Sequence, residues 1–329
     1  MGAMNVFAID VGGAFIKTAF LPASGKIRRK IIPFEMWKHP ERLAGVLDAL
    51  KPVGAYLAAV TMTGELCDCF KNRREGVRHI VRSASKVFGD VAMFGVKGGM
   101  MGPEEAVEKY GDVASANWAI PPLLVAQTER NFLLVDVGST TTDLTPVRNG
   151  KIANKGFTDF GRLKHGELVY SGYLRTPVQF LVRTAKLGKR EAPFSSEYFC
   201  IAGDAHLILG DISRSKYLSP TPDGGPKTKA GALRRLSRAM LADEGELASS
   251  ELRAVAKQVA EAQRDEIVRA AARFGLPLVT MGTGAFILDE AFKNGALEMV
   301  GSAKRYRWLD PSLALALLVS GRGETGRCR

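Results

Sequence analysis

The sequence predicts an α/β protein made of two similar halves, each with a mixed β-sheet and helices on its faces. Three observations predict this class. The chain has 329 residues, of which 46% are hydrophobic, enough for about two domains with substantial cores. A strand–turn–strand unit opens each half. Helical and extended patterns alternate after each unit, which is typical of a sheet covered by helices.

The repeat consists of an apolar strand that ends in Asp-Val-Gly. The first copy covers residues 5–17 (NVFAIDVGGAFIK) and the second covers residues 131–143 (NFLLVDVGSTTTD). A second strand and a turn before Lys-Ile follow in both copies, and the Asn-Gly turn of the second copy is a strong hairpin signal. We therefore expect three strands at the start of each half. We expect the first half to cover residues 4–125 and the second half to cover residues 126–329.

The remaining elements follow from periodicity and from breakers such as Gly and Pro. In the first half we expect helices and strands in alternation, with helices at 40–50 and 71–88 and strands at 55–61 and 91–96. In the second half we expect helical insertions and one more strand, with helices at 175–187, 228–241, 245–274 and from 285, and the strand at 276–282. A last apolar helix at 311–320 is able to pack back on the first half.

Composition narrows the classes of partner. The net charge of +12 suits either a solvated basic surface or an anionic small-molecule ligand. Nucleic acid is disfavoured because no Lys/Arg block with interleaved aromatic residues is present. No apolar run reaches the roughly 20 residues of a membrane-spanning helix. The cysteines lack a zinc spacing, so we expect reduced thiols and a cytoplasmic protein, with the oligomeric state left open.

The two Asp-Val-Gly segments are candidate phosphate loops. A carboxylate at a strand end can hold Mg²⁺, which makes Asp10 and Asp136 candidate metal ligands. Glycine lets the backbone approach a phosphate, and hydroxyls and turn N–H groups can donate to its oxygens. The candidate phosphate-binding residues are Gly12, Gly13, Gly138, Ser139, Thr140 and Thr141. A single copy would be explained as well by a simple turn, but two matched copies favour a phosphate site.

These loops resemble the phosphate loops of the actin/hexokinase/Hsp70 superfamily, whose members consist of two ribonuclease-H-like halves. The resemblance implies a ligand cleft between the halves. It also implies an adenosine motif, to which residues 280–286 are similar, with Gly282 and Gly284 as further phosphate-binding candidates. An ordinary βα turn explains that stretch equally well, so ATP binding stays open.

A closer resemblance covers nearly the whole chain. Its motifs are PFEMWK (33–38), MTGELCD (62–68), SANW (115–118), DVGSTTTD (136–143), LRTPV (174–178), SSEYF (195–199) and TPDG (221–224). Together they resemble the hydantoinase/oxoprolinase-like branch, in a subfamily linked to tetrahydromethanopterin C1 metabolism. Members of that subfamily include a methanofuran-biosynthesis transferase that joins an aminomethylfuran diphosphate to the phenol of γ-glutamyltyramine.

The resemblance implies that diphosphate leaves a furfuryl carbon as a tyramine-type phenol attacks it. The enzyme must neutralise the leaving group, position the phenol and exclude water. Asp10 and Asp136 with Mg²⁺, together with Lys17, suit the first task, and Asp143 or Glu65 could accept the phenol proton. Arg175 could clamp an anion or form a structural salt bridge. The substrate-binding candidates are Asn117, Trp118, Glu197 and Asp223. Core packing or helix capping would also explain why these residues are present.

Two other functions stay open. One is an ATP-dependent small-molecule kinase or an oxoprolinase-like hydrolase of the same fold, and the other is a nucleotide-dependent regulatory protein. Phe15 and Ile16 stand where the superfamily more often has polar residues, which argues against contacts with the terminal phosphates of a nucleotide. The transferase is therefore the leading interpretation.

Overall fold

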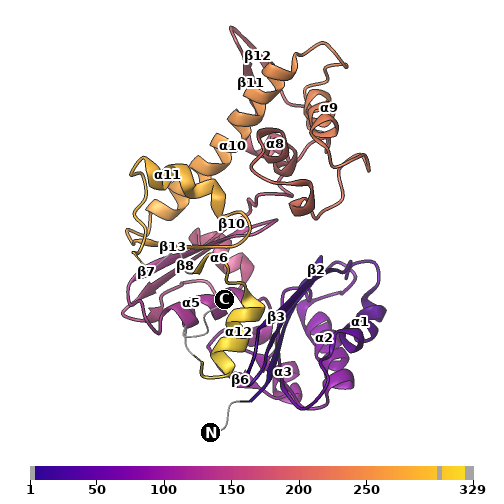
Figure 1. Ribbon diagram of the computed structural model, residues 1–329, viewed down its shortest axis with the longest axis vertical. Coiled ribbons are helices and arrows are strands. Elements are labelled where there is room, and N and C mark those ends of the chain that lie inside the picture. Colours follow the sequence, from indigo (N-terminus) through magenta and orange to yellow (C-terminus); the bar gives the residue numbers. More distant parts are fainter. Residues whose placement is uncertain (1–3, 302–305, 323–329) are drawn as a thin grey trace. The chain divides into compact units, whose positions relative to one another are not determined.

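The computed structural model describes residues 4–301 and 306–322 (Figure 1). The chain forms two compact units, and neither is continuous in sequence. Unit 1 contains the chain up to Asn131, the segment Thr145–Lys164 and the chain from Leu309. Unit 2 contains Phe132–Leu144 and His165–Trp308.

Unit 1 is built on a six-stranded sheet of order β3-β2-β1-β4-β5-β6. Its strands are β1 (Val6–Val11), β2 (Phe15–Leu21), β3 (Arg28–Pro33), β4 (Leu57–Met62), β5 (Val91–Phe94) and β6 (Met100–Met101). The first three strands pair antiparallel, whereas β1, β4 and β5 pair parallel. The mixed sheet predicted for this half is confirmed.

Helices cover both faces of this sheet. Side chains alternate along a strand, and Phe7, Ile9 and Val11 share a core cluster with α1 (Leu43–Leu50) and α2 (Arg73–Phe88). On the other face, α12 (Pro311–Val319) packs against β1, β2 and β4. The side chain of Asp10 lies on this second face because it alternates with the three core residues. The other helical segments of the unit are η1 (Pro40–Arg42), α3 (Pro103–Glu108), α4 (Tyr110–Val113), η2 (Asn117–Ala119), α5 (Ile120–Val125) and α6 (Asp159–His165).

The second sheet has the strand order β10-β8-β7-β13, with β9 paired to β8. Its strands are β7 (Phe132–Val137), β8 (Thr142–Arg148), β9 (Lys151–Ile152), β10 (Leu168–Val169) and β13 (Leu278–Met281). The helical segments of unit 2 are α7 (Val178–Leu181), α8 (Ala202–Leu209), η3 (Arg214–Lys216), α9 (Lys229–Ala239), α10 (Ser249–Ala272), η4 (Ala285–Leu288) and α11 (Asp289–Lys293). Residues from β7, β13, α8, α9 and α10 make up its main core cluster.

One predicted helix is wrong. Residues 175–187 form only the short α7, and the chain then enters a hairpin of β11 (Thr184–Leu187) and β12 (Arg190–Pro193). Burial alternates along β11, with Ala185 and Leu187 inside, and Gly188 makes the turn with a φ of 63°. A period of two and a glycine in the left-handed region favour a hairpin over a helix.

The last apolar helix is present, and packing accounts for its composition. All seven residues from Pro311 to Leu317 of α12 are buried. Among the described residues, no helix has both the length and the apolar composition that a membrane crossing requires.

Candidate functional site

The two Asp-Val-Gly segments adopt the same turn. The N–H of Gly12 donates to the carbonyl of Phe15 at 3.0 Å, and the N–H of Gly138 donates to the carbonyl of Thr141 at 2.9 Å. A Cβ on Gly12 would lie 2.7 Å from the Phe15 oxygen, and one on Gly138 would lie 3.2 Å from the Thr141 oxygen. A side chain at Gly12 would therefore force this turn to shift, and one at Gly138 would be tightly packed. We call residues 10–17 loop 1, in unit 1, and residues 136–143 loop 2, in unit 2.

Loop 1 is held by two of the sequence motifs. The N–H of Met36, in the Pro-Phe-Glu-Met motif, donates to the carbonyl of Gly13 at 2.9 Å. The N–H groups of Thr63 and Gly64, in the Met-Thr-Gly-Glu motif, both donate to the carbonyl of Val11 at 3.0 Å. These motifs, far apart in sequence, thus converge on the backbone of loop 1.

Asp10 is a buried carboxyl among charged groups. It is 3% exposed, and its Oδ1 is buried without a hydrogen-bond partner, whereas its Oδ2 lies 3.8 Å from Lys17 Nζ. Burial raises the pKa of Asp10, the charge of Lys17 and a hydrogen bond from Asn117 oppose the rise, and the charge of Asp310 adds to it. Arg29 forms an ion pair with Asp310. Loop 1 therefore carries a carboxylate that is costly to ionise until a cation reaches it.

The donor set at Asp10 fits a hard cation such as Mg²⁺. The orphaned Oδ1 is an anionic oxygen, the ligand type that Mg²⁺ prefers. Within the described residues, no cluster of three or more His, Cys, Asp or Glu side chains is positioned to hold a metal. Water and substrate phosphate would therefore complete the coordination, as is usual for Mg²⁺ held by one or two carboxylates.

Loop 2 is held by the Leu-Arg-Thr-Pro motif and by the tyrosine that precedes it. The N–H of Tyr173 donates to the carbonyl of Gly138 at 3.1 Å, and the N–H of Arg175 donates to the carbonyl of Ser139 at 2.8 Å. The backbone of Arg175 is thereby fixed beside the loop, and its side chain is exposed. This position allows the guanidinium to meet an anion bound at loop 2.

The turn at residues 282–284 packs against the strand end of loop 2. Gly282 has a φ of 85°, and a Cβ there would collide with Asp136 Oδ1 and the Val137 carbonyl. The N–H of Gly284 donates to the Val137 carbonyl at 2.9 Å. Both glycines thus have a packing role that places the turn directly beside Asp136.

A polar chain under loop 2 was missed by sequence reasoning. Gln263 Nε2 donates to the Gly172 carbonyl at 2.8 Å and to Ser171 Oγ at 3.1 Å. The carbonyl can only accept, so the amide orientation is determined, and Gln263 Oε1 accepts from His206 Nε2 at 2.9 Å. His206 Nδ1 lies 2.9 Å from Asp211 Oδ2. A glutamine inside a long helix gives no sequence signal for this role.

We expect Gln263→Leu to weaken loop 2 and the binding of inorganic diphosphate. The change leaves a buried carbonyl and a buried imidazole N–H without partners, which costs about 1–3 kcal/mol. Gln258→Leu is the matched control, because Gln258 lies on the same helix and bonds the N–H and carbonyl of Lys186, away from the loop. Both variants should lose stability in urea, but only Gln263→Leu should lose diphosphate affinity in calorimetry. Equal affinities would contradict the positioning role.

Glu65 lies in a buried polar cluster. It is 0% exposed; Ser115 Oγ lies 2.7 Å from its Oε1 and 3.1 Å from Asp159 Oδ2. Arg73 pairs with Asp159 at 3.0 Å. One hydroxyl proton cannot serve both carboxyls fully, and burial raises the pKa of Glu65. A protonated Glu65 that donates from Oε1 to Ser115 would leave the serine proton for Asp159, whereas Glu65 Oε2 is buried without a hydrogen-bond partner.

Two substrate-binding candidates contact arginines, and a third is exposed. Trp118 is 4% exposed, and the guanidinium of Arg162 lies 4.3 Å from its ring centroid. Asp223 pairs with Arg235 at 3.2 Å, and Glu197 is exposed.

The structure brings most candidates to one loop or the other. Unit 1 holds Asp10, Gly12, Gly13, Lys17 and Asn117, with Glu65 in the adjoining motif. Unit 2 holds Asp136, Gly138, Ser139, Thr140, Thr141, Asp143, Arg175, Gly282 and Gly284.

Two curated relatives match much of the chain. A protein of Methanocaldococcus jannaschii is 36% identical over 294 residues, which cover 87% of this chain and 88% of the relative. A protein of Methanococcus vannielii is 33% identical over 204 residues, which cover 58% of this chain and 91% of the relative. Both are named (4-{4-[2-(γ-L-glutamylamino)ethyl]phenoxymethyl}furan-2-yl)methanamine synthase.

The fold is shared with the solved nucleotide-free structure of an acetone carboxylase. It aligns with a TM-score of 0.58 at 10% sequence identity and covers 97% of this chain and 70% of that chain. The predicted actin/hexokinase/Hsp70-type fold class is confirmed. Residues 57–276 match the family described as Hydantoinase/oxoprolinase. With this match and the relative at 36% identity, the chain belongs to the hydantoinase/oxoprolinase family.

Proposed function

We propose that this chain is a transferase of methanofuran-type cofactor biosynthesis. It joins an aminomethylfuran diphosphate to the phenol of γ-glutamyltyramine, or of a related tyramine, and releases diphosphate. The observation that carries the proposal is the 36% identity to the Methanocaldococcus jannaschii synthase over 87% of the chain. The family match over residues 57–276 includes loop 2 and the motifs at 62–68 and 174–178.

The name of the relatives describes an aryl ether, in which a phenol oxygen is bonded to a methylene carbon of a furan. Such a bond forms when the phenol oxygen attacks that carbon and the bond from carbon to the diphosphate oxygen breaks. The phenol proton passes to a base, and the electron pair leaves with diphosphate. The furan ring stabilises the positive charge that develops on the carbon, so the protein chiefly has to bind and neutralise the leaving group.

The two loops supply the groups for that task. The N–H groups of Gly12 and Gly138 close their own turns, loop 2 adds the hydroxyls of residues 139–141, and Lys17 and Arg175 add positive charge beside their loops. When bound, Mg²⁺ would neutralise charge on the diphosphate, and the candidate ligands are Asp10 in loop 1 and Asp136 in loop 2. Phosphate binding of this kind needs no adenosine, which agrees with the packing role of Gly282 and Gly284.

Asp143 is the better of the two candidate proton acceptors. Glu65 is completely buried and bonded to Ser115, so a substrate phenol cannot approach it without rearrangement. Asp143 lies in β8 at the end of loop 2 and is partly exposed. A partly exposed carboxylate can accept a proton from a bound phenol and pass it to solvent.

Coupling should require a divalent cation, release one diphosphate for each ether formed and proceed without ATP. The assay combines purified protein, aminomethylfuran diphosphate, γ-glutamyltyramine and Mg²⁺. The ether product is detected by mass spectrometry, and the released diphosphate is measured by an enzyme-coupled assay. Parallel reactions omit the cation through a chelator or add ATP. Product that appears only with ATP, together with ADP, would contradict the transferase and support a kinase or an oxoprolinase-like hydrolase.

A further inference from the structure

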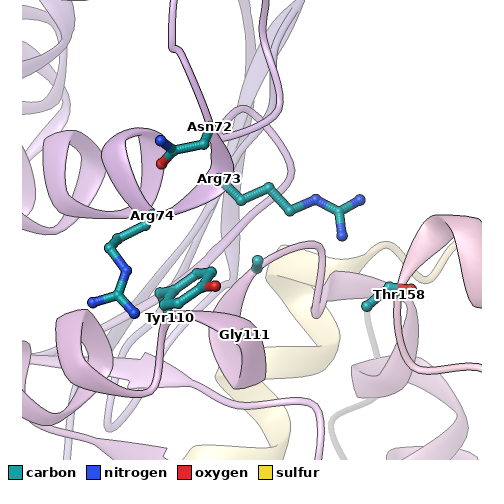
Figure 2. Close-up of a pocket in the computed structure, with 7 residues that line it drawn as sticks. Asn72, Arg73, Arg74, Tyr110, Gly111 and Thr158 are labelled. Carbon is teal, nitrogen blue, oxygen red and sulfur yellow. The ribbon is translucent and has the colours of Figure 1, made fainter.

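Unit 1 contains a cavity that the phosphate loops do not use. It has a volume of about 520 Å³ and is lined by Arg73 and Arg74 at the start of α2, by Tyr110 and Ala114, and by Thr158 (Figure 2). Small-molecule sites are commonly about 300–1,000 Å³ in volume with a few placed polar groups. The cavity is therefore large enough for one polar arm of a substrate.

The two arginines differ in their surroundings. Arg73 pairs with Asp159 at 3.0 Å, and its charge is largely compensated, although its Nε is buried without a partner. The guanidinium of Arg74 lies 4.5 Å from the ring centroid of Tyr110, and within the described part of the chain it has no ion pair. Figure 2 shows Arg74 beside the Tyr110 ring and Arg73 extending toward Thr158. The cavity thus presents one uncompensated positive charge, with a second set of guanidinium donors beside it.

The wall of the cavity is joined to loop 1 through a short segment. Asp159, the partner of Arg73, lies 3.1 Å from Ser115 Oγ. Ser115 has a φ of 49°, a strained value for a residue with a side chain, and two residues later Asn117 bonds the carboxyl of Asp10. One end of this segment therefore contacts the cavity wall and the other contacts the candidate metal ligand.

We propose that this cavity binds the α-carboxylate of the acceptor's γ-glutamyl group through Arg74. The proposal rests on the proposed function, because the γ-glutamylamino group appears in the name of the relatives' product. A planar guanidinium can bind a carboxylate through two parallel hydrogen bonds, and the contact with the Tyr110 ring restricts where the Arg74 guanidinium can lie. A single uncompensated charge matches one carboxylate, whereas a diphosphate would require several cations.

The test compares two ligands and three proteins in calorimetry. The ligands are γ-glutamyltyramine and its analogue with the α-carboxylate converted to a carboxamide. The proteins are the wild type, Arg74→Met, and Arg78→Met as a matched control, since Arg78 is an exposed arginine one turn further along α2. We expect the wild type and Arg78→Met to prefer the carboxylate over the carboxamide by about ten- to a hundredfold. Arg74→Met should bind both ligands with the same weak affinity.

A carboxylate preference that persists in Arg74→Met overturns the proposal, as does a wild type that binds the two ligands equally. The result is independent of the proposed reaction, because no furan diphosphate is present. If the preference depends on Arg74 but no ether forms in the coupling assay, the function fails and the cavity assignment stands. If ether forms and Arg74→Met keeps the wild-type KM for γ-glutamyltyramine, the cavity assignment fails and the function stands.

Discussion

Asp10→Asn should abolish ether formation without lowering the stability of the protein. The carboxylate is the buried anion of loop 1 with an orphaned oxygen, and the amide can neither hold a divalent cation nor balance Lys17. Removing a preorganised charged group from a site of this kind costs about a hundredfold or more in kcat. The measurement is the rate of diphosphate release at saturating substrates, with Asp48→Asn as the control because Asp48 pairs with Lys51 on the surface.

The stability of this variant follows from the raised pKa of Asp10. A folded-state pKa above the unfolded value means that the folded protein holds the proton more tightly, so ionisation costs stability. This cost is complete above the raised pKa and disappears as the pH falls below the unfolded value. Asp10→Asn should therefore melt at or above the wild-type temperature at pH 7, with a difference that shrinks toward acidic pH. A variant that keeps full activity, or that unfolds earlier at pH 7, would contradict the assignment.

Gly172→Ala should disable loop 2 through a steric effect. A Cβ at this position would lie 2.5 Å from the N of Thr140 and 2.6 Å from backbone carbons of Ser139 and Thr140. These are main-chain atoms, so the loop itself must shift. A displacement near 1 Å in a positioning element costs on the order of a hundredfold in rate, and overpacking costs about 1–3 kcal/mol of stability.

Calorimetry with inorganic diphosphate, kinetics and urea unfolding separate these effects. Gly45→Ala is the control, because no heavy atom lies within 4 Å of a Cβ there and the residue is inside α1. The control should keep wild-type diphosphate affinity and gain slightly in stability, as alanine does in a helix. If Gly172→Ala binds diphosphate as tightly as the wild type does, loop 2 is not a phosphate-binding element.

Much of the local geometry of the candidate site could be predicted because its signals are local. An apolar strand followed by Asp-Val-Gly needs only a few neighbouring residues to define a strand end and a tight turn, and the matched hydrogen bonds of Gly12 and Gly138 agree with it. The long motifs also predicted the family, which the comparisons confirm. Roles that depend on distant partners could not be predicted. Gln263 and His206 lie on helices, and nothing near them in sequence indicates that they support Gly172.

The helix predicted at 175–187 is wrong because the structure of this segment also depends on distant partners. Its local pattern suits either state, and pairing with β12 and burial of Ala185 and Leu187 decided for a strand. The sequence by itself determined the repeat, the two glycine turns and their strand-end carboxylates, since short-range sterics and hydrophobic periodicity encode them. Only the tertiary structure decided that Glu65 is sealed from solvent, that Asp10 has a raised pKa and that Arg74 lines a cavity. Burial and charge environment depend on groups from the whole chain, and no stretch of sequence contains them.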